Sequence, residues 1–143
     1  MGKHHTKEKG DLGVLKAKIA LHEQGFMILN PETEHSPFDL VGYKDGKFFR
    51  FQVKYRALVN GSIIIPSFTG WADKNGFHKK RYDLNEIDYF VAYCPDVDKC
   101  YFVSADDFND KKSVTLRVVE SKNNQAVGVK FAYNYEKLYW RIV

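Results

Sequence analysis

The chain has 143 residues, of which 44% are hydrophobic and 15% aromatic, and this length and composition predict one domain, residues 1–143, with a core of its own. Its 22 basic and 18 acidic residues give a formal net charge of +4, which by itself does not indicate a polyanionic ligand. No apolar run has the length of a membrane span and no signal-peptide pattern is present, so we expect a cytoplasmic protein with no membrane partner.

The first predicted element is a helix over residues 9–25. Leu12, Leu15, Ile19 and Leu21 to His22 recur at three- and four-residue steps, which predicts a helix with these residues on its apolar side. Two acids, Glu8 and Asp11, stand one helical turn apart at its start. The helix dipole favours acids there, which accounts for both of them structurally. The alternative is that one of them ligates a metal, if the helix start packs against the predicted hairpin.

A short strand over residues 26–29 leads through a loop to a predicted β-hairpin over residues 37–54. His35 in the loop is interpreted as an exposed residue rather than a catalytic one. The hairpin turn is Asp45-Gly46, because a type I′ turn needs positive φ at both central residues. This register places Asp39 directly opposite Gln52.

The second arm of the hairpin alternates between apolar and polar side chains. One face carries Phe49, Phe51, Val53 and Tyr55, and the other carries Arg50, Gln52, Lys54 and Arg56. Asp39, Gln52 and Lys54 therefore share a face, with Lys54 one diagonal step from Asp39. Any half-exposed strand shows such polar alternation, so the pattern admits a structural interpretation beside the functional one.

The functional interpretation is a metal-dependent nuclease site. Mg²⁺ prefers oxygen ligands, keeps several waters and typically uses one or two carboxylates together with phosphate. Asp39 supplies one carboxylate and Gln52 a neutral amide oxygen, so a second acid is expected from Asp11, Glu8 or Glu34. The Lys54 ammonium can stabilise the charged phosphate in the transition state or position the attacking water.

The second half begins with a predicted strand over residues 62–66, expected to pair behind the hairpin. Residues 67–83 show no periodicity and are predicted to form a long loop, and loops of this length are usually functional. Three consecutive cations in this segment are followed by Tyr82, a mixture suited to phosphate contact and base stacking. The cations are Lys79, Lys80 and Arg81. The alternative is a solvated loop with a basic tip.

Strands are then predicted over residues 87–94, 99–103 and 113–119. Cys94 and Cys100 flank a turn and are expected to face each other across two strands, as reduced thiols that pack like small apolar residues. Ser104 is predicted to cap a helical turn, and residues 134–140 to form a short helix. After these strands comes a polar loop whose side chains can hydrogen-bond to phosphates or base edges. These residues are Lys122, Asn123, Asn124 and Gln125.

The spacing of Pro37-Phe38-Asp39 and Gln52-Val53-Lys54 resembles the motif of the PD-(D/E)XK nuclease superfamily, which has the restriction-endonuclease fold. Lys9-Gly10-Asp11 at the start of the first helix fits the same pattern. The second half resembles the branch of homing endonucleases encoded in bacterial group I introns. The residues that carry this resemblance are Trp71, Arg81-Tyr82, Tyr89-Phe90-Val91, Leu116-Arg117 and Asn123-Asn124-Gln125.

The resemblance implies an α/β protein with a restriction-endonuclease-like core, in which an N-terminal helix packs on a central mixed β-sheet with a catalytic β-hairpin. Additional C-terminal strands and short helices follow. It implies a site-specific endonuclease for double-stranded DNA that uses Mg²⁺, with Mn²⁺ as a substitute, and works as a homodimer or homotetramer. Asp39, Gln52 and Asp11 would be metal ligands, with Lys54 and Glu8 also catalytic. The DNA contacts would be residues 79–81 and 122–125.

Two departures from the family pattern leave alternatives open. Gln52 stands where the motif usually has an acid, and Val14 stands where related sequences often have a helix Glu. Asp11, then Glu8, would therefore complete the metal site. The alternatives are a Holliday-junction resolvase or repair nuclease on the same core, and a catalytically inactive DNA-binding module.

Overall fold

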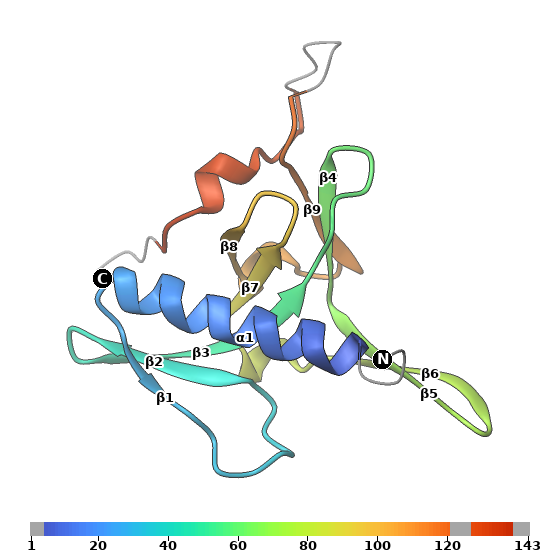
Figure 1. Cartoon of the computed structure of the whole chain (residues 1–143), viewed down its shortest axis with the longest axis horizontal. Helices are drawn as coiled ribbons and strands as arrows, with labels where there is room; N and C mark the ends of the chain where they lie inside the picture. Colours follow the sequence, from blue (N-terminus) through green and yellow to red (C-terminus); the bar gives the residue numbers. More distant parts are fainter. Residues whose placement is uncertain (1–4, 121–126, 139–143) are drawn as a thin grey trace.

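The computed structural model describes residues 5–120 and 127–138, and its centre is a five-stranded sheet (Figure 1). The strands are β1 (Met27–Leu29), β2 (Leu40–Lys44), β3 (Lys47–Tyr55), β7 (Tyr89–Cys94) and β8 (Lys99–Ser104), in the order β1-β2-β3-β7-β8. Strands β3 and β7 run parallel and the other neighbours antiparallel. The sheet is therefore mixed, and the predicted fold class is confirmed.

Helix α1 (His5–Glu23) lies across one face of this sheet and starts before the predicted residue 9. It is followed by Gly25, whose φ of +89° is readily adopted by glycine and suits a helix C-terminus. Gly13 faces β3 so closely that a Cβ there would lie 3.6 Å from the side chains of Val53 and Tyr55. The helix thus covers the apolar face of β3.

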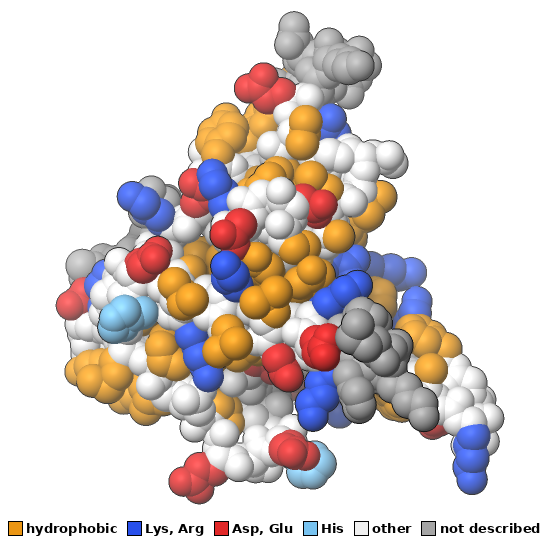
Figure 2. Space-filling view, viewed as in Figure 1, with side chains coloured by type: hydrophobic (Ala, Val, Ile, Leu, Met, Phe, Trp, Pro, Cys, Tyr) orange, Lys and Arg blue, Asp and Glu red, His pale blue; other side chains and the backbone are white. Residues whose placement is uncertain are grey.

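The predicted apolar side of α1 is correct at Leu21 and wrong at its other three leucine and isoleucine positions. Ala17 and Leu21 are fully buried against the sheet, whereas Leu12, Leu15 and Ile19 are 39%, 57% and 53% exposed. Figure 2 shows hydrophobic side chains gathered along the outer side of α1. The reason is steric: glycine and alanine let the helix backbone approach the sheet closely, whereas large side chains on that side would hold it away.

The hydrophobic core lies on both faces of the sheet. Under α1 it is formed by Ala17, Leu21, Phe26, Leu40, Phe51, Val53, Val91, Phe102 and Leu138. On the other face it is larger and is formed by Ile63, Ile65, Ile87, Phe90, Ala92, Cys94, Tyr101, Val103, Ala105, Phe108, Val114, Leu116 and Ala132. Strand β7 contributes to both, because successive side chains of a strand point to opposite faces.

Strands β4 (Ser62–Pro66) and β9 (Ser113–Arg117) form a separate antiparallel pair that supplies part of the second core. The prediction that residues 62–66 pair with the hairpin is wrong. Strand β3 already has β2 on one edge and β7 on the other, so neither edge is free. The predicted strand over residues 113–119 ends at Arg117.

Residues 67–83 are not the predicted long loop, because they contain a second hairpin, β5 (Phe68–Asp73) and β6 (Gly76–Arg81). It projects away from the body of the molecule (Figure 1). Most of its side chains are exposed on both faces, so no inside-outside alternation marks it in the sequence. At its tip the Asp73 carboxylate accepts the Asn75 backbone N–H at 2.7 Å.

Short 3₁₀ helices complete the described chain: η2 (Leu84–Glu86), η3 (Ala105–Asp107) and η4 (Ala132–Tyr135). Ser104 caps η3 as predicted, and η4 begins before the helix predicted over residues 134–140, whose last two residues lie outside the described range. No helix in these two ranges is both long and apolar enough to cross a membrane.

The two cysteines are free thiols, as predicted, but they do not face each other. Cys94 lies opposite Lys99, and Cys100 lies opposite Tyr93. The four-residue turn between β7 and β8 sets this register, which directs the two thiols to opposite faces of the sheet.

Candidate active site

The hairpin of β2 and β3 has the predicted register. Asp45 and Gly46 have φ values of +51° and +80°, the positive pair that a type I′ turn requires. At the other end of the hairpin, the Asp39 backbone N–H donates to the carbonyl of Phe51 at 2.9 Å. Asp39 and Gln52 are therefore cross-strand neighbours, and this geometric prediction is confirmed.

The Asp39 carboxylate is held by two hydrogen bonds to its Oδ2 atom. The Gln52 side-chain Nε2 and the Val53 backbone N–H each donate at 2.8 Å. Burial raises the pKa of Asp39 above its ordinary value, although the Val53 hydrogen bond and the charge of Lys54 act against the rise. An additional cation bound next to Asp39 would favour the charged form of this carboxylate.

The Lys54 ammonium is held by Tyr82. Its Nζ atom donates to the Tyr82 hydroxyl at 2.6 Å and lies 4.6 Å from the centre of the Tyr82 ring. Burial lowers the pKa of Lys54 to about 8, and the nearby Asp39 charge opposes the fall. Sequence reasoning missed this role of Tyr82, because 28 residues separate it from Lys54.

Other cations on the same face of β3 serve the fold. Arg50 makes a two-pronged ion pair with Asp88, with Nε 3.0 Å from Oδ2 and Nη2 3.1 Å from Oδ1. Asp88 Oδ2 also accepts the Arg50 backbone N–H at 2.7 Å, so this pair joins β3 to the start of β7. Arg56 donates its Nε to the carbonyl of Ile64 at 2.7 Å. Lys54, by contrast, lies close enough to Asp39 for their charges to interact.

The acids predicted to complete a metal site are all exposed. Glu8 and Asp11 are on α1, which covers the opposite face of β3, while Glu34 lies in the loop before the hairpin together with His35. Within residues 5–120 and 127–138, no group of three or more His, Cys, Asp and Glu side chains is placed to hold a metal ion. The participation of Asp11 or Glu8 therefore stays a prediction.

The donor set at Asp39 fits a hard cation in composition. Asp39 offers a partly buried carboxylate, and the Gln52 amide carries an oxygen beside the nitrogen that binds Asp39. Rotation of the Gln52 amide by half a turn exchanges its two atoms and would turn the oxygen toward a cation bound at Asp39. One carboxylate, one amide oxygen and a substrate phosphate suit Mg²⁺, which keeps water as its other ligands.

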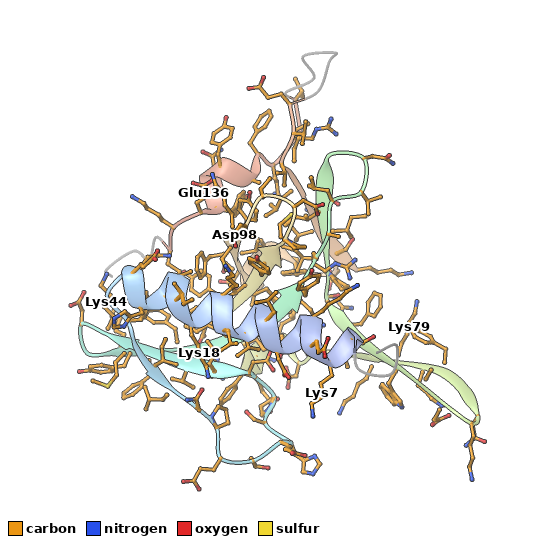
Figure 3. The ribbon with its side chains drawn as sticks, viewed as in Figure 1. Lys7, Lys18, Lys44, Lys79, Asp98 and Glu136 are labelled. Atoms are coloured by element: carbon orange, nitrogen blue, oxygen red, sulfur yellow. The ribbon has the colours of Figure 1, made fainter. Side chains whose placement is uncertain are left out.

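The β5–β6 hairpin carries the predicted nucleic-acid contacts. Lys79 lies 4.8 Å from the centre of the Phe68 ring on one face, and Trp71 stacks on His78 at 5.4 Å on the other, which is also the face of Lys80. Figure 3 labels Lys79 on this projecting ribbon.

Arg81 differs from the two lysines, because it donates to the carbonyl of Asn109 at 3.1 Å at the hairpin base. The other predicted contacts lie outside the described residues. These are Lys122, Asn123, Asn124 and Gln125.

A helix packed on a mixed sheet, with an Asp at the start of a hairpin and a Gln-x-Lys sequence on its second strand, defines a nuclease of the restriction-endonuclease type. The family model described as PD-(D/E)XK endonuclease matches residues 4–138, and the chain belongs to this family. The predicted family is thus confirmed, and the protein is a nuclease.

A solved structure shows the same fold. It is the structure of a bacterial homing endonuclease, I-Ssp6803I, with a TM-score of 0.73 and 23% sequence identity. The match covers 92% of this chain and 88% of that one. No curated protein matches the chain.

Proposed function

We propose that this nuclease is a site-specific endonuclease for double-stranded DNA, of the homing type, that depends on Mg²⁺ and accepts Mn²⁺ as a substitute. The observation that carries the proposal is the convergence of Asp39, Gln52 and Lys54 on one face of the hairpin. The structural similarity to a homing endonuclease supports the specific type.

Each residue has a distinct task in this proposal. Asp39 and the Gln52 amide oxygen would hold the metal. Asp11 or Glu8 is proposed as the second acid, although in this structure α1 covers the opposite face of β3. When bound, the ion would activate water and neutralise charge on the phosphate. The Lys54 ammonium would contact a phosphate oxygen and stabilise the negative charge that develops there.

The β5–β6 hairpin is suited to bind the DNA duplex, because a two-stranded β-ribbon fits the major groove. Lys79 and Lys80 stand on opposite faces of the ribbon and would contact phosphates, while Trp71 offers an aromatic surface. We also propose that residues 122–125 contact DNA. A homodimer or homotetramer would cut both strands, since one active site cuts one strand.

The test is cleavage of a plasmid library with a randomised insert, in buffer with Mg²⁺ or Mn²⁺. We expect the wild-type chain to linearise a subset of plasmids, and sequencing of the ends would give the site. Lys54→Ala and Asp39→Asn are expected to lose cleavage and keep DNA binding. Lys47→Ala is the matched control, because Lys47 is exposed at the other end of the same strand.

The neutral Gln52 also supports a second candidate, an inactive DNA-binding module. If the wild-type chain binds DNA but cleaves none of the library with either metal, this second candidate replaces the first. A four-way DNA junction belongs in the same assay. Preferential cleavage of the junction over linear DNA would instead indicate a resolvase or repair nuclease.

A further inference from the structure

Tyr82 stands where the β5–β6 hairpin joins the body of the protein. Its backbone N–H donates to the carbonyl of Ser67 at 3.0 Å, which closes the base of the hairpin. Ser67 is only 1% exposed, and its hydroxyl donates to the carbonyls of Lys111 and Lys112 at 3.2 and 3.0 Å. The base of the hairpin is therefore fixed to the core, although its tip is exposed.

The Tyr82 side chain turns from this base toward β3. Its ring packs edge-on against buried Phe90, with 5.7 Å between ring centres, so the ring has a defined orientation. Its hydroxyl accepts a hydrogen bond from Lys54. Burial raises the pKa of this hydroxyl, and the side chain of Thr69 on β5 acts against the rise. One hydroxyl group thus joins the proposed DNA-binding hairpin to the lysine of the nuclease motif.

We infer that Tyr82 is a positioning residue that orients the Lys54 ammonium for the phosphate and links it to the β5–β6 hairpin. This inference rests on the proposed function. A free lysine side chain rotates about four bonds, and fixing its end in advance removes an entropic cost from the reaction. The Tyr82 hydroxyl occupies one N–H of the ammonium, which leaves the others for substrate.

The variant Tyr82→Phe tests the inference because it removes the hydroxyl and keeps the ring. On a plasmid bearing a cleavable site from the library selection, we expect the single-turnover rate at saturating protein to fall about tenfold, as the loss of one charged hydrogen bond implies. The Kd for the same DNA without metal should stay unchanged. Tyr133→Phe is the control, since Tyr133 is 66% exposed on η4.

A second measurement needs no DNA. In the full chain with ¹⁵N-labelled lysine, the Lys54 NH₃⁺ signal should be visible, because its hydrogen bond slows proton exchange. The signal is assigned by its loss in Lys54→Arg. We expect it to disappear in Tyr82→Phe and to remain in Tyr133→Phe.

The outcomes separate this inference from the proposed function. An unchanged cleavage rate in Tyr82→Phe, a weaker Kd with an unchanged rate, or a persistent Lys54 signal would each overturn the positioning role while wild-type cleavage stands. A wild-type chain that cleaves no DNA would overturn the proposed function and this inference with it.

Discussion

Asp39 and Lys54 carry opposite charges close together, yet burial outweighs their attraction at both residues. The pKa of Asp39 is raised and that of Lys54 is lowered, so the charged form of each residue destabilises the folded protein. Such a pair is costly for the fold, and perturbed ionisable groups of this kind cluster at functional sites. Substitutions that remove one of these buried charges should therefore reduce activity and increase the stability of the fold.

Lys54→Met should make the protein more stable at pH 7, by about 1–2 kcal/mol, because it removes a buried charge at the cost of one hydrogen bond to Tyr82. The folded pKa is about 8 and the ordinary value 10.5. Between these values the unfolded chain binds more protons, so wild-type stability rises with pH. The advantage of the variant should shrink over this window in urea unfolding experiments.

The control is Lys47→Met on the exposed start of β3, which should change the free energy of unfolding by less than about 0.5 kcal/mol. A less stable Lys54→Met variant at pH 7 would show that the contacts with Tyr82 outweigh the burial of the charge.

Gln52→Glu asks whether a second carboxylate beside Asp39 strengthens metal binding. Without metal the two carboxylates should repel each other and lower the melting temperature. With Mn²⁺ the variant should bind on the order of tenfold more tightly than wild type, because metal affinity grows with the charge of the ligands. Calorimetric titration measures the affinity, and Gln52→Leu, which offers no oxygen, should bind least. If Gln52→Glu and the wild-type chain bound Mn²⁺ with equal affinity, the metal would bind at another site.

At the scale of elements, two hairpins have different physical origins. The β2–β3 hairpin is determined by its turn and by one apolar face that must be buried, so its register is readable in the sequence. The β5–β6 hairpin is exposed on both faces and depends on its anchored base, because an isolated two-stranded ribbon is marginally stable in water.

The Asp45-Gly46 turn should be sensitive to loss of glycine. Gly46 has φ of +80°, and a Cβ added there would meet open space, so Gly46→Ala tests backbone strain alone. We expect a loss of about 1 kcal/mol in stability. Gly10→Ala is the matched control, since Gly10 lies in α1 with equally open space, and alanine there should gain about 0.5–1 kcal/mol. Equal effects in urea unfolding would contradict the type I′ assignment.

Lys79→Ala and Lys80→Ala should weaken DNA binding without affecting the fold, because both side chains are on the exposed ribbon. Each lost phosphate contact should reduce the slope of log K against log salt by about 0.9. Fluorescence anisotropy across a salt series measures the slope. Lys18→Ala on α1, over the opposite face of the sheet, should leave it unchanged (Figure 3). If the salt dependence changed in Lys18→Ala and not in Lys79→Ala, the DNA would bind on the face of the sheet that α1 covers.

At the scale of the whole molecule, the sheet separates a helical layer from the face of the candidate site. Gly13 and Ala17 let α1 lie close to β3, and this brings Leu21 into the core. The consequence of this packing is an outer side of α1 with three exposed apolar residues. The same sheet face that carries Gln52 and Lys54 continues, through Phe90 and Ala92, into the second core.

Leu21→Ala and Leu15→Gln test this packing directly. Leu21 is fully buried, so its truncation should cost about 2–4 kcal/mol. Leu15 is 57% exposed, so its replacement should change stability by less than about 0.5 kcal/mol. Thermal or urea unfolding of both variants measures the difference. Similar losses at both positions would support the apolar side that the spacing predicts and contradict the observed one.

The sequence by itself determined the hairpin that carries the candidate site. The Asp45-Gly46 turn and the alternation after it are local, so they set which residue faces Asp39 without reference to the rest of the chain. The family also followed from this motif and its spacing, together with the order of the elements.

Only the tertiary structure decided which side of α1 is buried, which strand pairs with β4 and what holds Lys54. Helical periodicity does not reveal how closely a helix approaches a sheet, and Gly13 and Ala17 carry no strong apolar signal. Tyr82 reaches Lys54 from 28 residues away along the chain. Such contacts depend on how separate elements pack, and no local rule of spacing contains that information.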